Sequence, residues 1–235
     1  MTAVLDIRDL HAWYGESHIL HGVNLSVNQG EVVTLLGRNG AGRTTTLRSI
    51  MGLVGRREGS IKVNGDETIR LSTHRIAHKA IGYCPEERAI FASLSCEENL
   101  LLPPVVSDKG KAMSIAEIYR MFPNLEERKR SPGTRLSGGE QQMLAVARIL
   151  RTGANLLLLD EISEGLAPVI VQALARMIME LKARGYTVVM VEQNFRFAAP
   201  LADRFYVMEH GTIALQFESG ELQEKMSALN ELLGV

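Results

Sequence analysis

Residues 37–44 form a glycine-rich segment that is compatible with few folds. They read Gly-Arg-Asn-Gly-Ala-Gly-Arg-Thr, after an apolar stretch at 32–36 and before a helix-forming stretch at 45–51. A strand that passes through a glycine loop into a helix is typical of phosphate-binding loops, whose pattern is glycine, four residues, glycine, lysine and serine or threonine. Gly37, Gly42 and Thr44 match this pattern, and Arg43 replaces the lysine. The segment therefore predicts an α/β fold that binds a nucleotide triphosphate.

The chemistry of this loop follows from its glycines and from the helix behind it. Glycine lets successive backbone N–H groups turn toward phosphate oxygens, and the helix N-terminus favours negative charge. The Thr44 hydroxyl is placed to reach Mg²⁺. Arg43 keeps the positive charge, but a planar guanidinium is longer than an ammonium group. The arginine leaves three outcomes open: a natural variant in which other residues compensate for it, a weak site or an inactive site.

Composition indicates one compact unit and excludes several classes of protein. The 235 residues can bury a core without help, and the net charge of −1 creates no overall field for nucleic acid or an anionic membrane. No stretch approaches 18 uninterrupted apolar residues, and a charge as early as Asp6 predicts that there is no signal peptide. Cys84 and Cys96 are expected to be free thiols in a reducing cytosolic compartment.

Apolar patterning predicts strands that alternate with helices. Strand-like runs cover residues 4–10, 23–27, 60–63, 81–84, 156–159, 188–191, 205–208 and 212–215. Helices are expected at 73–77, after Ser95, after Ser137, from Pro168 to Ala183, and near 222–233; the two serines open capping boxes with Glu98 and Glu140. This alternation predicts a mostly parallel sheet.

Residues 86–150 are predicted to form a helical lobe inserted in the α/β core. Within them, residues 105–135 are charged and punctuated, with Ser-Asp-Lys-Gly at 107–110 and a mainly basic run at 126–130. Ile115, Ile118 and Phe122 have helical spacing. The basic run is interpreted as a solvated face.

A second motif follows the apolar residues 156–159, where the chain reads Asp160-Glu161. An aspartate at the end of a buried strand brings its carboxylate to a magnesium site at the carboxyl edge of a sheet. Glu161 then lies where an attacking water would stand, so it is predicted to be a general base or to orient the water. Two solvated acids after a core strand are the alternative, which the upstream glycine loop disfavours.

The third motif is Leu-Ser-Gly-Gly-Glu-Gln-Gln at residues 136–142. Together with the glycine loop and Asp160-Glu161, in this order, it resembles the ATP-binding cassette family. A helix start with Ser137, Gly138 and Gly139 is also a second anion site. An ordinary capped helix accounts for Ser137 but not for the two glycines, which weaken a first helical turn.

The resemblance covers essentially the whole chain and implies its architecture. We expect a single ATPase domain over residues 1–235, with a P-loop core, a mostly parallel sheet, an N-terminal antiparallel β region and the helical lobe at 86–150. In the family, the segment after Ser137 closes over the γ-phosphate of ATP bound to a partner subunit. Tyr14 falls where the family stacks an aromatic ring on adenine; neighbouring Trp13 in that role, or a core role for either ring, stays open.

The resemblance also implies the cofactors, ATP and Mg²⁺, and the site residues. The nucleotide-binding residues are Tyr14, Gly37, Arg38, Asn39, Gly40, Ala41, Gly42, Arg43, Thr44, Thr45, Ser137, Gly138 and Gly139. The metal-binding residues are Thr44, Glu86 and Asp160, and the catalytic residues are Glu161 and Gln193.

Two of these residues depart from most of the family. Glu86 occupies a position that is usually glutamine, and Gln193 replaces a histidine that contacts the γ-phosphate. An amide donates a hydrogen bond but cannot become a cation. With residues 163–168 and 202–204, these features resemble the shorter ATPase subunit of branched-chain amino-acid importers. Glu87, Ile162 and Arg43 still differ from that subfamily.

That subfamily implies partners and a location. A second ATPase subunit is expected, different from this chain or identical to it, with two transmembrane permeases, an indirectly acting periplasmic binding protein and no nucleic acid. The complex would sit at the cytoplasmic face of the inner membrane. The transported molecule cannot be read from a subunit that does not touch it.

Three alternatives remain open. A urea or amide importer shares the Glu-Gln pair at 192–193. A nucleotide-gated scaffold is favoured by Arg43. An ATPase that acts on nucleic acid or ribosomes is disfavoured by the balanced charge and by the absence of a second cassette or a basic tail.

Overall fold

The computed structural model describes residues 3–106 and 112–234, so the charged segment 107–110 lies outside the described residues. The first sheet is antiparallel and has the order β2-β1-β4-β5. It consists of β1 (Ala3–Tyr14), β2 (Ser17–Asn28), β4 (Arg56–Val63) and β5 (Asp66–Glu67). The predicted N-terminal antiparallel region is therefore confirmed.

The second sheet has six strands in the order β10-β9-β3-β8-β7-β6. They are β3 (Val32–Gly37), β6 (Ile81–Cys84), β7 (Leu156–Asp160), β8 (Thr187–Val191), β9 (Arg204–Glu209) and β10 (Thr212–Glu218). All neighbours in this sheet are parallel except β9 and β10, which form a hairpin. The mostly parallel sheet expected from the sequence is confirmed.

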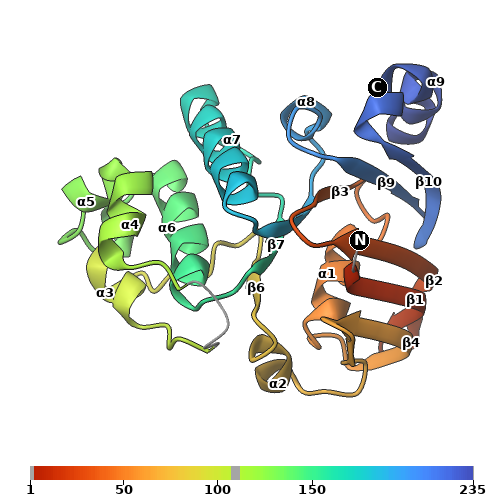
Figure 1. Ribbon diagram of the computed structural model, residues 1–235, viewed down its shortest axis with the longest axis horizontal. Helices are drawn as coiled ribbons and strands as arrows, with labels where there is room; N and C mark the ends of the chain where they lie inside the picture. Colours follow the sequence, from red (N-terminus) through yellow and green to blue (C-terminus); the bar gives the residue numbers. More distant parts are fainter. Residues whose placement is uncertain (1–2, 107–111, 235) are drawn as a thin grey trace.

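At strands β7 and β8, the two faces of this sheet belong to two different cores. In β7 and β8, side chains alternate between the faces because successive residues of a strand point in opposite directions. Leu158 and Val189 pack toward the antiparallel sheet, with α1 (Arg43–Ile50) between the two sheets. Leu157 and Val188 pack on the other side against α6 (Gly138–Arg151) and α7 (Pro168–Ala183). Figure 1 shows this layered arrangement.

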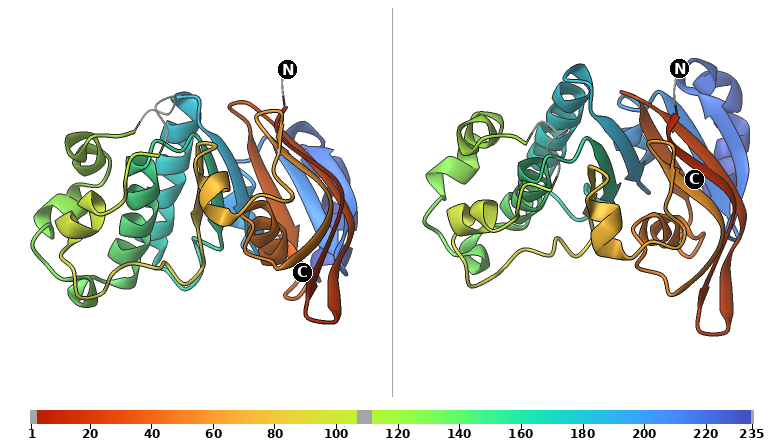
Figure 2. Two further views of the ribbon diagram at one scale, coloured as in Figure 1. Left: turned by 90° about the horizontal axis from the view of Figure 1, so that it is seen from below. Right: turned by 60° about the horizontal axis from the view of Figure 1, so that its bottom comes forward.

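A helical lobe projects from the face that lies opposite the antiparallel sheet (Figures 1 and 2). It contains α3 (Cys96–Leu101), α4 (Ile115–Met121), α5 (Pro123–Glu127) and α6. Both predicted capping boxes, at Ser95 and Ser137, are present, and Ser114 forms a third. The fold class predicted from the sequence, a P-loop core with an inserted helical lobe, is confirmed.

The structure also differs from the sequence predictions in detail. Strands β1 and β2 extend beyond the predicted runs at 4–10 and 23–27; register shifts between Leu10 and His11 and between Ala12 and Trp13 interrupt the alternation in the added part. The helix α8 (Phe195–Ala198) was not predicted, since four residues are too few to establish a helical period. The helices α2 (Thr73–Ala77) and α9 (Leu222–Leu233) match the predictions. Among the described residues, no helix is long and apolar enough to cross a membrane.

Candidate nucleotide site

The predicted motifs converge because the strands that carry them are parallel neighbours. The carboxyl ends of β3, β8, β7 and β6 lie along one edge of the sheet. The glycine loop follows β3, while Asp160 ends β7 and pairs with Val191 at the end of β8. Ligands of open α/β sheets bind at this edge.

The glycine loop needs its glycines where the chain passes close to its neighbours. A Cβ atom on Gly37 would lie 2.5 Å from the carbonyl oxygen of Met208. Gly42 has a φ of 104°, a region that L side chains rarely adopt, and it is the residue before α1. The loop thus turns sharply into the helix and presents the N-terminus of α1 to the cavity.

A cavity of about 510 Å³ lies over this loop. It is lined by Tyr14, Ile19, Asn39, Gly40, Ala41, Gly42, Arg43, Thr44, Thr45, Glu86, Glu161, Glu164 and Gln193. Most of the predicted nucleotide residues are therefore brought together. Gly37 and Arg38 instead line an adjoining cavity toward α9.

Thr44 and Asp160 supply the oxygen atoms of the site that suit a metal ion. The Thr44 hydroxyl donates to Asp160 Oδ1 over 3.0 Å, and the Tyr83 hydroxyl donates to Asp160 Oδ2 over 2.9 Å. Burial raises the pKa of Asp160, while these two hydrogen bonds oppose the rise. A hydroxyl beside a carboxylate suits Mg²⁺, which prefers oxygen ligands. The residues present therefore fit the ion that the family resemblance implies.

Arg43 reaches the predicted catalytic base. Its Nη2 lies 2.8 Å from Glu161 Oε1, and its side chain is only 4% exposed. The Nη1 atom is buried and has no hydrogen-bond partner among the described residues. On the other side of the carboxylate, Gln193 Nε2 donates to Glu161 Oε2 over 3.0 Å. Both oxygens of Glu161 are thus engaged by donors.

These contacts set the electrostatics of Glu161. Burial raises the pKa of Glu161, and the positive charge of Arg43 opposes that rise. Burial likewise lowers the pKa of Arg43, and Glu161 opposes that change. Glu161 also has a φ of 49°, a conformation that a non-glycine residue keeps only where its surroundings hold it.

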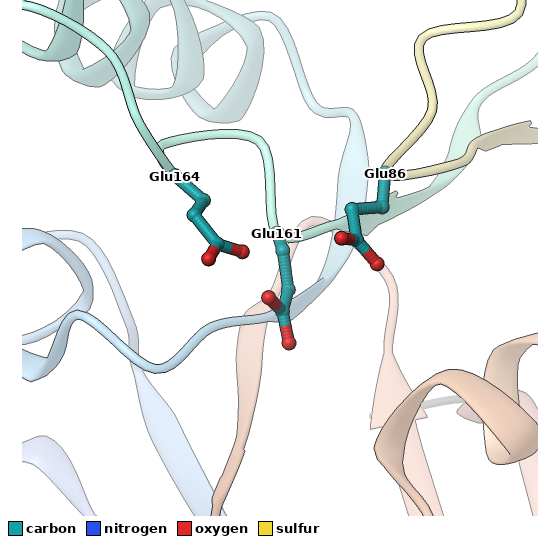
Figure 3. Close-up of side chains that lie close together, drawn as sticks. All are labelled: Glu86, Glu161 and Glu164. Carbon is teal, nitrogen blue, oxygen red and sulfur yellow. The ribbon is translucent and has the colours of Figure 1, made fainter. Parts of the chain in front are cut away.

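Two further acids, Glu86 and Glu164, lie beside Glu161. One carboxylate oxygen from each of Glu86, Glu161 and Glu164 lies within 4.8 Å of the other two. Figure 3 shows the three side chains close together. Burial, and then the charge of Glu161, raise the pKa of Glu86. Glu164 was not singled out from the sequence, because an acid in the loop after a motif looks like a solvated residue.

The two candidate aromatic platforms have different surroundings. Trp13 stacks on His18 with ring centroids 4.2 Å apart, and the Arg56 guanidinium lies 4.2 Å from its ring centroid. Tyr14 is 43% exposed and lines the cavity over the glycine loop. Of the two rings, only Tyr14 borders that cavity.

The start of α6 does not line the cavity. Ser137 caps this helix, accepting from the Glu140 backbone N–H over 3.3 Å. A Cβ atom on Gly139 would lie 2.7 Å from Ile170 Cγ1, so close packing of α6 on α7 gives a reason for this glycine. Within one chain, the predicted residues Ser137, Gly138 and Gly139 remain apart from the glycine-loop cavity.

Sequence reasoning missed three polar residues near the site: Tyr83, Ser163 and Glu192. Tyr83 binds Asp160 from β6, and the buried Glu192 accepts two hydrogen bonds from Ser163. An acid directly after the apolar run 188–191 was the available signal for Glu192.

Comparison with known proteins places the chain in a family. A family model for ABC transporters matches residues 20–164. The chain is 39% identical to the high-affinity branched-chain amino acid transport ATP-binding protein BraG of Pseudomonas aeruginosa, over 98% of this chain and 100% of BraG. It is 34% identical to the lipopolysaccharide export system ATP-binding protein LptB of Escherichia coli, over 89% of this chain and 88% of LptB.

The fold of the chain also matches that of a known ATP-binding cassette. A nucleotide-free ATP-binding cassette from an ABC transporter, known from its crystal structure, superposes with a TM-score of 0.85 at 21% identity, covering 100% of this chain and 99% of that one. The chain therefore belongs to the ABC transporter family of ATP-binding cassettes, ATPases that hydrolyse ATP to power transport.

Proposed function

We propose that this chain is the ATP-binding and hydrolysing subunit that powers import of branched-chain amino acids through partner permeases. The named function of BraG, which matches over its whole length, supports this substrate class. The segments at 85–86, 163–168 and 191–194, which resemble the same subfamily, also support it. LptB shows that a similar cassette serves the export of a very different molecule.

The observation that supports ATP hydrolysis is the convergence of four strand ends, those of β3, β6, β7 and β8, on one cavity. Arg43, Thr44 and the backbone N–H groups of the loop hold the phosphates, and Tyr14 stacks on adenine. Thr44 and Asp160 hold Mg²⁺, with Glu86 acting directly or through water; when bound, the ion neutralises phosphate charge. Glu161 takes the proton from the attacking water.

Gln193 completes the γ-phosphate side of the site. Its amide donates to Glu161 over 3.0 Å, so the same side chain can orient the base and contact the phosphate. An amide provides this hydrogen bond without a charge that changes with pH.

The remaining predicted residues act between subunits. Ser137, Gly138 and Gly139 lie outside the cavity of their own chain, and they meet the glycine loop of a second ATPase subunit when ATP closes the dimer. Two permeases anchor the pair at the cytoplasmic face of the inner membrane, and a periplasmic binding protein delivers the substrate to them.

Reconstitution with partner permease subunits tests the substrate class. Addition of leucine, isoleucine or valine with the binding protein should stimulate phosphate release in proteoliposomes. Urea, small amides and lipopolysaccharide serve as comparison substrates. Stimulation by one of these, and not by the amino acids, would reject the proposed class and leave the ATPase assignment intact.

The ion pair between Arg43 and Glu161 favours a second candidate, a nucleotide-gated scaffold that binds ATP without turnover. A base whose oxygen is held by a buried guanidinium is less available to accept a proton from water. Single-turnover measurement with Mg-ATP separates the two functions. Release of phosphate supports the ATPase, whereas tight binding without release supports the scaffold.

A further inference from the structure

Glu192 is a buried acid that the proposed reaction does not use. It is 1% exposed and directly follows β8, one residue before Gln193. Its backbone N–H donates to the carbonyl oxygen of Leu35 in β3 over 3.2 Å. The main chain of Glu192 is therefore fixed to the strand that leads into the glycine loop.

The carboxylate of Glu192 holds the loop that follows the catalytic base. Ser163 Oγ donates to Glu192 Oε2 over 2.7 Å, and the Ser163 backbone N–H donates to Glu192 Oε1 over 3.2 Å. Ser163 is itself 4% exposed. Two hydrogen bonds to one carboxylate define the position of Ser163 better than a single bond does.

These contacts close a ring around Glu161. From Glu161 the chain runs through Ile162 to Ser163, which binds Glu192; Gln193 follows and returns to Glu161 Oε2 over 3.0 Å. The Glu161 backbone N–H is also held, by the carbonyl oxygen of Val191 over 2.9 Å. The ring encloses the residue whose φ of 49° requires support from its surroundings.

Packing holds only one side of this loop, through Ile162, which is buried in the hydrophobic core. A cavity of about 650 Å³ lies beside it and is lined in part by Ser163, Glu164, Leu166, Glu192 and Gln193. On the side of the loop that borders open space, the hydrogen bonds to Glu192 supply the restraint that packing of Ile162 does not.

A carboxylate at this position has an energetic cost. Burial raises the pKa of Glu192 to about 7, and the two bonds from Ser163 oppose the rise. The charged groups that face it are Glu161, which raises the pKa further, and Arg43, which lowers it. An uncharged side chain would fill the same space without this cost. The carboxylate of Glu192 is therefore expected to have a role beyond packing.

We infer that Glu192 is a positioning residue for ATP hydrolysis, which ties the loop of Ser163 to the loop of Gln193 and thereby holds Glu161 in line with the attacking water. This inference rests on the proposed ATPase function. Because the inference assigns Glu192 no contact with nucleotide, it predicts that a change at Glu192 lowers the rate of the chemical step and leaves nucleotide affinity unchanged.

Steady-state kinetics of the full chain, with its partner subunit where activity needs one, test the inference. Glu192→Gln and Ser163→Ala should each lower kcat at least tenfold, about 1.4 kcal/mol of barrier, with KM for ATP within twofold of the wild type. Ser163→Thr keeps the hydroxyl and should recover most of the rate. The double variant should be no slower than the slower single variant, because both changes break one link.

The matched control is Glu31→Gln, a carboxylate that pairs with Arg204 at the opposite end of β3. This variant should lower stability and leave kcat within twofold. If Glu192→Gln does not fold, the comparison of Ser163→Ala with Ser163→Thr still tests the positioning role. A kcat within twofold of the wild type in Ser163→Ala would overturn the inference.

Amide hydrogen exchange provides a readout that does not depend on turnover. Exchange across residues 161–168 should become faster in Glu192→Gln and Ser163→Ala but not in Glu31→Gln. A wild-type chain that never releases phosphate would reject the proposed function, and the exchange data would still test the positioning role. Unchanged exchange in both variants would overturn that role.

Discussion

The Nη2 atom of Arg43 lies 2.8 Å from Oε1 of Glu161, and both side chains are buried. The residue that replaces the phosphate-binding lysine is thus paired with the predicted general base. An adjacent positive charge favours the ionised form of a carboxylate and makes it a weaker base. A bound phosphate would therefore compete with Glu161 for one guanidinium, whose Nη1 has no hydrogen-bond partner within residues 3–106 and 112–234 and offers a second contact.

Arg43→Lys should raise kcat at least fivefold and change the Kd for Mg-ATP by less than about threefold. A compact ammonium can follow charge on the γ-phosphate and does not span to Glu161 with a planar fork. Phosphate-release kinetics and fluorescence titration measure the two quantities. Arg8→Lys, on the surface of β1, is the control. A rate within about twofold of the wild type, less than half a kcal/mol of barrier, would show that the site has adapted to arginine.

Arg43→Ala should weaken Mg-ATP binding by about 1.5–3 kcal/mol, the scale of a hydrogen bond to a charged group. It should also destabilise the fold, because Glu161 is left as a buried acid without its cation. Adding Glu161→Gln should recover part of the lost stability by removing that charge. Urea unfolding of the single and double variants checks this. Equal stability of the two would mean that the ion pair does not compensate a buried charge.

Glu161→Gln should lower turnover by roughly 10²–10⁴-fold, the usual contribution of a general base. ATP binding should persist, since the carboxylate acts on water rather than on bound nucleotide. Phosphate release and nucleotide titration of the same preparation separate the two effects. Hydrolysis at the wild-type rate would remove Glu161 from the mechanism.

The regular elements could be predicted because their buried faces leave a period or an apolar run in the sequence. The runs at 156–159 and 188–191 became β7 and β8, and capping boxes marked the starts of α3 and α6. The extra length of β1 could not be predicted, since register shifts between Leu10 and His11 and between Ala12 and Trp13 break the alternation there.

The candidate site was predictable as a set of residues but not as a set of contacts. Motif spacing identified Arg43 and Glu161 separately, although they lie 118 positions apart. Their pairing depends on the reach of a guanidinium from a loop whose shape no local pattern specifies. The bond between Ser163 and Glu192 arises because β7 and β8 are neighbours, which only the order of the strands reveals.

Gly139→Asp should prevent ATP-driven dimerisation, because its carboxylate would approach the γ-phosphate bound by the other subunit. Gly139→Ala is the matched control, since in both variants the new Cβ meets Ile170 and only aspartate adds charge. Sedimentation velocity with Mg-ATP in a Glu161→Gln background, alone and with the partner ATPase, measures association. Equal association of the two variants would reject the composite site.

The stability of the chain should depend on pH through Glu192. Its pKa rises from an ordinary value of 4.5 to about 7 in the fold, so between these values the folded chain binds more protons than the unfolded chain does. The stabilisation is complete below about pH 4.5 and is lost as the pH rises through 7.

Glu192→Gln removes this dependence while Glu161 and Arg43, the charged groups facing Glu192, remain. From pH 5 to pH 8 the wild type should therefore lose up to about 3 kcal/mol more unfolding free energy than the variant, at about 1.4 kcal/mol for each pH unit between the two pKa values. Urea unfolding at steps of half a pH unit measures the unfolding free energy of both chains. The other acids of the site are present in both, so their contributions cancel in the difference. Parallel curves for wild type and variant from pH 5 to pH 8 would mean that the pKa of Glu192 is not raised.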